Sequence, residues 1–419
     1  MSSTTLSAAA AAAVLVVTTA GQALAAKETA IYTFAGGNDG GFPHGGVVAD
    51  ATGAFYGTTT SGGSGHSGVV YKLTPPAAGK KRWTQSTLYA FTGGNDGQLP
   101  EAAVLLDSAS GALFGTTYQG GSAGNGVVFK LTPPAAGQTA WTQSVLWTFS
   151  GGNDGSQPSG ALIEDASGNL YGTTTAGGTG VVGTVFELSP PAAGQTAWTE
   201  TVLYNFTGNN DGGQPFGSVL LGGDGSLYGT TAGYGQYNYG VVYRLSPPKK
   251  SGGKWGFHLV HAFKGGADGE VPRDGLIADS SGALYGATAG FDNSLGTVFK
   301  LTPGSGDKWT QKVLYSVTGQ GFEGNGPWQT VAMDSAGALY AATYGTGTST
   351  FGEVFKLTPP AGGGAKWRAR VLHTFTGGAK SEYPYTNVLI GSDGTLYGTT
   401  YGTAGQAGFF PGTVWKITQ

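Results

Sequence analysis

One short pattern of apolar and polar residues recurs seven times along the chain. In the third copy it runs from Leu170 to Thr174, an apolar pair followed by glycine and two threonines. The aromatic residue of each copy stands at position 56, 114, 171, 228, 285, 340 or 397, so the copies are 58, 57, 57, 57, 55 and 57 residues apart. A fixed period of this length is typical of a repeat architecture. The chain therefore consists of seven versions of one unit of about 57 residues.

Each unit contains four segments with the composition of β-strands. In the third unit they cover residues 161–165, 170–174, 183–188 and 198–206, which are rich in β-branched and aromatic residues. Glycine- and proline-containing turns separate them. Four-stranded units repeated around an axis form a β-propeller. We predict an all-β fold, a seven-bladed propeller of four-stranded antiparallel blades, and a single domain over residues 26–419.

The two ends of the chain predict how the ring closes. The last unit stops after its third strand, at Val414 to Ile417, whereas residues 28–34 at the start repeat the fourth strand. The N-terminal strand is therefore expected to pair with the last blade as its outermost strand. Such pairing covers an edge that would otherwise promote aggregation.

The first 25 residues have the pattern of a secretory signal peptide. Residues 8–17 are apolar, and Ala23-Leu24-Ala25 is a small-residue processing site. The apolar run is shorter than the roughly 20 residues that a spanning helix needs, so we expect no transmembrane segment once the signal is removed. We expect cleavage after Ala25 and a monomer that is secreted, periplasmic or located at the cell surface.

The composition excludes several kinds of function. The net charge is −3, which provides no electrostatic basis for binding nucleic acid. Cysteine is absent, which excludes a disulfide framework, a thiolate metal site and a cysteine nucleophile. The five histidines form no metal-spaced pair, and no motif for phosphate binding or hydrolysis occurs. We predict no cofactor, no metal site and no catalytic residue.

Three motifs together resemble a known family. In consensus form they are Leu-Tyr-Gly-Thr-Thr, Gly-Thr-Val-Phe-Lys-Leu-Thr-Pro-Pro and Phe-Thr-Gly-Gly-Asn-Asp-Gly, and they recur from about Thr29 to Ile417. This combination resembles the GloVer-repeat proteins, which bacteria export or display at the surface. The strand order is also similar to that of NHL- and WD-repeat propellers. The resemblance implies export and a repeat fold, without a settled activity.

The strongest candidate site lies where the units differ. The residue after the strand-one proline changes from unit to unit, as His44, Glu101, Ser159, Phe216, Arg273, Trp328 and Tyr385. In a propeller this position surrounds the mouth of the central channel. The loop between strands two and three, on the same face, becomes aromatic in units four to seven. We predict a ligand site on this face of blades four to seven, formed by Arg273, Asp274, Trp328, Gln329, Tyr385, Tyr234, Tyr237, Tyr239, Phe291 and Phe351.

Two questions stay open at this level. A repeated turn carries an acid in five units, and these acids either bind a cation or satisfy the backbone of their own turns: Asp39, Asp96, Asp154, Asp211 and Asp268. The predicted function is a non-catalytic binding or scaffold propeller for an extracellular glycan or protein. The alternative is a glycoside hydrolase or lyase that acts on polysaccharide through acids near the mouth, namely Asp274, Glu323 and Glu382. A hydrolase pair would lie either about 5–5.5 Å or about 6.5–9.5 Å apart.

Overall fold

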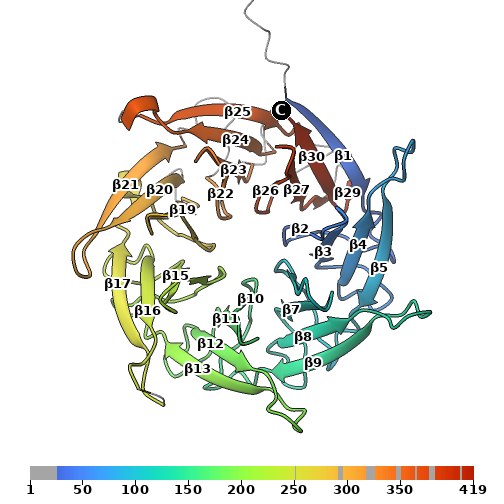
Figure 1. Cartoon of the computed structure of the whole chain (residues 1–419), viewed down its shortest axis with the longest axis horizontal. Coiled ribbons are helices and arrows are strands. Elements are labelled where there is room, and N and C mark those ends of the chain that lie inside the picture. The colour runs from blue at the N-terminus through green and yellow to red at the C-terminus, as the bar shows by residue number, and fades with distance from the viewer. Residues whose placement is uncertain are drawn as a thin grey trace, which may run out of the picture.

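Seven four-stranded antiparallel sheets surround a central axis in the residues that the structure describes, which confirms the predicted seven-bladed propeller (Figure 1). The computed structural model describes residues 26–250, 252–290, 296–317, 326–345, 351–363, 366–376, 383–405 and 408–419. No helix in these ranges is both long and apolar enough to cross a membrane.

The blades follow one another in chain order, each with its first strand innermost (Figure 1). Blade one consists of β2 (Val48–Ala49), β3 (Phe55–Thr59), β4 (Val69–Thr74) and β5 (Thr84–Ala90). Blade two consists of β6 (Leu105–Leu106), β7 (Leu113–Thr117), β8 (Val127–Thr132) and β9 (Thr142–Thr148). Blade three consists of β10 (Ile163–Glu164), β11 (Leu170–Thr174), β12 (Thr184–Ser189) and β13 (Thr199–Asn205). Blade four consists of β14 (Leu220–Leu221), β15 (Leu227–Thr231), β16 (Val241–Ser246) and β17 (Gly256–Ala262).

The remaining three blades keep the same order, with small additions. Blade five consists of β18 (Ile277–Ala278), β19 (Leu284–Thr288), β20 (Thr297–Pro303) and β21 (Trp309–Ser316). Blade six consists of β22 (Ala332–Met333), β23 (Leu339–Thr343), β24 (Glu353–Thr358) and β25 (Arg368–Thr374). Blade seven consists of β26 (Leu389–Ile390), β27 (Leu396–Thr400), β30 (Thr413–Thr418) and β1 (Lys27–Thr33). The additions are two 3₁₀ turns, η1 (Gly266–Asp268) and η2 (Ala361–Gly363), and a hairpin of β28 (Thr403–Gly405) and β29 (Gly408–Phe410).

The N-terminal strand closes the ring as predicted. β1 pairs antiparallel with β30, from Lys27 opposite Thr418 to Thr33 opposite Thr413. The next residue, Phe34, is 2% exposed, and its backbone N–H donates to the Gly412 carbonyl at 3.1 Å. Blade seven is therefore built from both ends of the described chain.

Five repeats carry a pair of threonines, and the two residues of a pair bind different neighbours. Thr173 Oγ1 donates to the Gly217 carbonyl of the next blade at 3.0 Å. The same kind of bond recurs from Thr58, Thr116, Thr230 and Thr399. Thr174 Oγ1 instead donates to the Ala176 carbonyl of its own loop at 3.0 Å. The first strand of blade three is β10, two residues instead of the predicted 161–165, because this innermost strand has a partner on one side alone and only Ile163 and Glu164 lie opposite β11.

The recurring Asp turn stabilises the end of the outer strand. In the turn after blade three, the Asp211 carboxylate accepts bonds from the Tyr204 hydroxyl at 3.0 Å and from the Thr207 amide at 2.8 Å. Asp39, Asp96, Asp154 and Asp268 accept the equivalent backbone bond in their own turns. This arrangement favours the backbone role over cation binding. No group of three metal-ligating side chains with suitable geometry occurs among the described residues.

A glutamate at one position of the outer strand of blade three is expected to make the stability of the folded protein depend on pH. In three blades a glutamine two residues after the repeated tryptophan donates to the carbonyl of the Asp turn: Gln85, Gln143 and Gln311. Blade three has Glu200 there, and its Oε1 is buried without a partner. Burial raises the pKa of Glu200 to about 7, and the Asp154 charge adds to the effect. Folding therefore favours the protonated acid, and this stability is present below about pH 4.5 and lost as pH rises through about 7.

Glu200→Gln is expected to stabilise the protein above pH 7 and to change little below about pH 4.5. The amide restores the donor that the ionised carboxylate lacks. Because the side chain keeps part of its surface in water, we expect a gain of about 1–2 kcal/mol. Urea denaturation at pH 4.5 and pH 8.5 measures it. Gln143→Glu is the matched control and is expected to introduce the same pH dependence in blade two. An equal effect of Glu200→Gln at both pH values would contradict the assignment.

Candidate functional site

In six of the seven blades a strained residue comes directly before the strand-one proline, and the variable residue that follows the proline is called the mouth residue. In six blades the residue before the strand-one proline is not glycine and has a φ between 56° and 59°: Phe42, Leu99, Gln157, Gln214, Val271 and Tyr383. Such a conformation costs about 1–3 kcal/mol and persists where surrounding bonds fix it. In blade four the Gln214 N–H donates to the Val182 carbonyl of blade three at 2.7 Å, and its carbonyl accepts from Ala232 N–H at 3.0 Å. The strained residue therefore links two blades and fixes the backbone that follows it.

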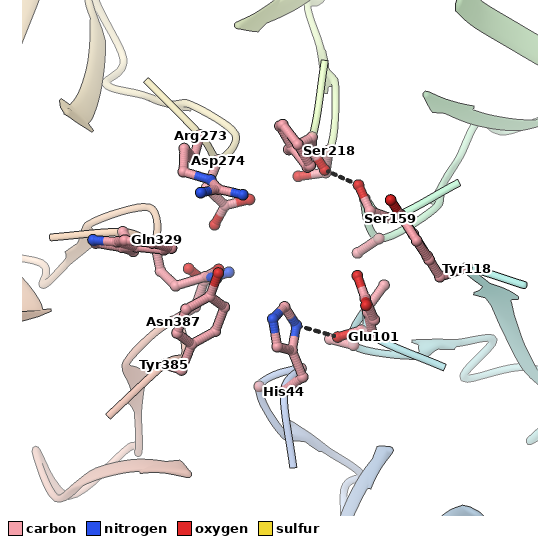
Figure 2. A pocket seen from close by; sticks show the side chains of 18 residues that line it. His44, Glu101, Tyr118, Ser159, Ser218, Arg273, Asp274, Gln329, Tyr385 and Asn387 are labelled. Carbon is pink, nitrogen blue, oxygen red and sulfur yellow. Dashed lines mark hydrogen bonds between the residues drawn. The ribbon is translucent and has the colours of Figure 1, made fainter. Parts of the chain in front are cut away.

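The seven residues after the proline line one cavity at the channel mouth, which has a volume of about 280 Å³ (Figure 2). They are His44, Glu101, Ser159, Phe216, Arg273, Trp328 and Tyr385. The sequence placed the site in blades four to seven, but the cavity takes side chains from all seven blades. Polar groups one or two residues further along the chain complete the lining: Asp274, Gln329, Ser218 and Asn387.

Arg273 lies between two aromatic rings from neighbouring blades. Its guanidinium carbon is 4.5 Å from the ring centre of Phe216 and 4.6 Å from that of Trp328. Both contacts are within the range of cation–π attraction. No carboxylate of the described residues lies within 4.0 Å of the guanidinium. The rings therefore hold the cation in place while its N–H groups keep no ion-pair partner in the described part of the chain.

On the opposite side of the cavity, burial shifts the pKa of two titratable groups in the direction that favours the neutral form. Burial raises the pKa of Glu101 to about 7, although the Arg273 charge opposes the shift. Burial lowers the pKa of His44 to about 4, so the imidazole is neutral at physiological pH. His44 Nδ1 donates to the Glu101 carbonyl at 3.3 Å, which leaves Nε2 as an acceptor (Figure 2). The cavity can therefore change its charge near neutral pH through Glu101.

The structure adds an aromatic wall that the sequence analysis missed. Tyr344 packs against Trp328 and Tyr385, with ring centres 5.2 Å and 5.7 Å away. Tyr401 lies 6.3 Å from Tyr385 and lines a side pocket of about 260 Å³ together with it. Tyr118 lines the main cavity, and its hydroxyl donates to Gln157 Oε1 at 3.1 Å. All three tyrosines directly follow the last threonine of the repeated motif, a second variable position that the 57-residue period could have revealed.

The other predicted site residues do not line this cavity where the structure describes them. Tyr234, Tyr237 and Tyr239 are 38%, 39% and 37% exposed in the outer loop of blade four. Phe351 packs against Tyr383, with ring centres 5.8 Å apart, and against the core of blades six and seven. Phe291, Glu323 and Glu382 lie outside the described residues. Arg273, Asp274, Trp328, Gln329 and Tyr385 are thus the predicted residues that the fold brings together.

Comparisons with known proteins agree with the repeat architecture. The model of the Gloeobacter/Verrucomicrobia repeat matches residues 7–220 and 214–419. No curated protein matches the chain. Among solved structures, a puromycin-hydrolyzing peptidase of Mycobacterium tuberculosis is similar, with TM-score 0.53 and 12% identity over 90% of this chain and 51% of its own. The chain thus spans about half the length of that peptidase.

Two further solved structures align with this chain over most of its length and most of their own. Polysaccharide lyase Uly1 has TM-score 0.49 and 11% identity over 90% of each chain. The PQQ-bound aldose sugar dehydrogenase of Streptomyces coelicolor has TM-score 0.43 and 12% identity over 94% of this chain and 98% of its own. At identities this low, similarity between structures concerns the fold and not the activity.

Proposed function

The chain belongs to the Gloeobacter/Verrucomicrobia repeat family, and from that premise we propose that it is an exported binding protein whose channel mouth holds a glycan. Export rests on the apolar segment at residues 8–17 and the processing site at Ala23-Leu24-Ala25. Both lie outside the described residues, so this part of the proposal depends on the sequence alone.

The ring of seven different side chains is the observation that carries the proposal. The scaffold repeats from blade to blade, yet the residues that converge on the mouth cavity do not. A single asymmetric ligand explains such divergence at a point where all the blades meet. Flat aromatic rings such as Trp328 and Tyr385 can stack on sugar faces. Amides such as Gln329 and Asn387 beside them can select hydroxyl positions.

The size of the cavity favours a glycan over a protein as the ligand. A volume of about 280 Å³ is near the lower limit of small-molecule sites, about 300–1,000 Å³. It suits one sugar-sized group at the end of a chain. A protein partner would instead bind across the surrounding loops, where the exposed tyrosines of blade four lie.

A polysaccharide-active enzyme is the second candidate, because Glu101 has the raised pKa expected of a general acid. Asp274 is the other carboxylate that lines the cavity in the described residues. If the protein is such an enzyme, incubation with polysaccharide releases new sugar chain ends, and the Glu101→Gln variant does not release them. If it is a binding protein, no new chain ends form with either protein.

Trp328→Ala is expected to weaken glycan binding at least about 30-fold, the effect of losing a binding hot spot of 2 kcal/mol or more. The substitution removes one face of the cavity and one of the two rings that hold Arg273. A glycan array with residues 26–419 identifies the ligand, and calorimetry measures the loss. Ser159→Ala is the control, because the Ser159 hydroxyl is already bonded to the Phe216 carbonyl at 3.0 Å. If Trp328→Ala binds normally while Ser159→Ala does not, the aromatic side of the mouth is not the site.

A further inference from the structure

The cavity contains a cation that no described acid neutralises by direct contact. Arg273 points toward the open centre, and Asp274 and Tyr385 stand beside it (Figure 2). Asp274 is the nearest acid in sequence, yet its Oδ2 accepts the Thr330 backbone N–H at 2.8 Å. The guanidinium is held by rings instead of by a carboxylate. A site built only for neutral hydroxyls does not need a permanent charge in this position.

The geometry around Arg273 fits a planar anion. The Phe216 and Trp328 rings contact the guanidinium carbon without taking up its N–H donors, and a planar guanidinium matches the two oxygens of a carboxylate. The aromatic walls also displace water, which strengthens a charge-assisted bond. A sugar that carries a carboxylate would combine this bond with stacking against the aromatic wall.

We infer that the bound glycan is acidic, with a terminal uronic acid whose carboxylate binds Arg273 while Glu101, across the cavity, is protonated. This inference rests on the proposed glycan-binding function and names its ligand class. An ionised Glu101 would add a second negative charge to a small cavity that already contains Asp274. A protonated Glu101 removes that repulsion and supplies a hydroxyl donor.

The groups around Glu101 set the pH range of this effect. Its own pKa is about 7. His44 and Tyr385 have pKa values of about 4 and about 12, so both stay neutral between pH 5.5 and pH 8.5. Arg273 stays cationic, and a sugar carboxylate stays ionised. If only the protonated form binds, the apparent affinity falls about 30-fold between pH 5.5 and pH 8.5.

Paired oligosaccharides test the inference. Each pair consists of an oligosaccharide that ends in a uronic acid and the same molecule with its carboxyl group reduced to an alcohol. Calorimetry with residues 26–419 at pH 5.5 should show at least a tenfold preference for the acid. Arg273→Met should abolish this preference, and Glu101→Gln should bind the acid equally well at pH 5.5 and pH 8.5. Arg244→Met is the matched control, because Arg244, on β16, pairs with Asp307 in the turn between β20 and β21 at 2.7 Å and does not line the cavity.

The outcomes separate this inference from the proposed function. Equal binding of both members of every pair would overturn the acidic ligand and leave glycan binding intact. A preference for the acid that does not change with pH would overturn the role of protonated Glu101. Binding of neither member of any pair, in a protein that melts cooperatively, would overturn both. A peptide with a free C-terminus serves as a further probe, and its binding in place of the sugars would also overturn both.

Discussion

Removal of residues 26–35 is expected to open blade seven and to make the protein aggregate. The deletion takes away β1, and β30 then presents a row of unpaired backbone groups. It also removes Phe34, which packs against Tyr71 of blade one with ring centres 5.0 Å apart. Loss of a buried phenylalanine side chain alone costs about 3–5 kcal/mol. Thermal unfolding and light scattering of residues 36–419 against residues 26–419 measure the effect.

A peptide in trans provides the control for this deletion. A synthetic peptide of residues 26–35 should bind the truncated protein and restore part of its melting temperature, because β1 supplies a complete edge strand. An unchanged melting temperature and a monomeric truncated protein would show that β1 does not hold the ring closed.

Gly398→Ala is expected to cost about 1–3 kcal/mol, the range for overpacking a core. A Cβ at this position would overlap Cζ2 of Trp415, which is fully buried. In six blades the repeat places a glycine against a phenylalanine, tyrosine or tryptophan ring, whereas blade six carries Ala341 opposite Phe355. Only movement of the Trp415 indole or of the β27 backbone would make room for the methyl group.

The matched control is Gly223→Ala. Gly223 is exposed, and a Cβ there would meet no atom within 4 Å. Urea denaturation should give almost the same free energy of unfolding for this variant as for the natural chain. If Gly398→Ala is equally harmless, steric exclusion by the ring is not the reason for the repeated glycine.

The fold could be predicted because its determinants repeat. Strand limits such as 170–174 and the pairing of residues 28–34 with the last blade followed from the period alone, and the structure confirms them. The first strand is shorter than predicted, because it is the innermost strand with a partner on one side alone, and in blade three only Ile163 and Glu164 lie opposite that partner. The extent of this pairing depends on the path of the chain at the channel, which residue composition does not show.

The candidate site could be predicted only in part, because it consists of residues that differ from one repeat to the next. The variable position after the proline correctly marked the mouth residues such as Arg273 and Trp328. The contacts of Arg273 with Phe216 and Trp328 join residues 57 and 55 positions apart in sequence, and the raised pKa of Glu101 depends on its burial in the folded ring. The aromatic character of Tyr234, Tyr237 and Tyr239 predicts that they belong to the ligand site, but these side chains are exposed in the loop of blade four and do not line the cavity.

A crystal structure of residues 26–419 with the glycan that the array identifies shows directly whether the ligand binds in the mouth cavity. We expect one sugar ring there, with its face against Trp328 or Tyr385 and a polar oxygen within about 3.2 Å of the Arg273 guanidinium. A glycan bound on the outer loop of blade four, at Tyr234, Tyr237 and Tyr239, with the mouth cavity unoccupied, would contradict it.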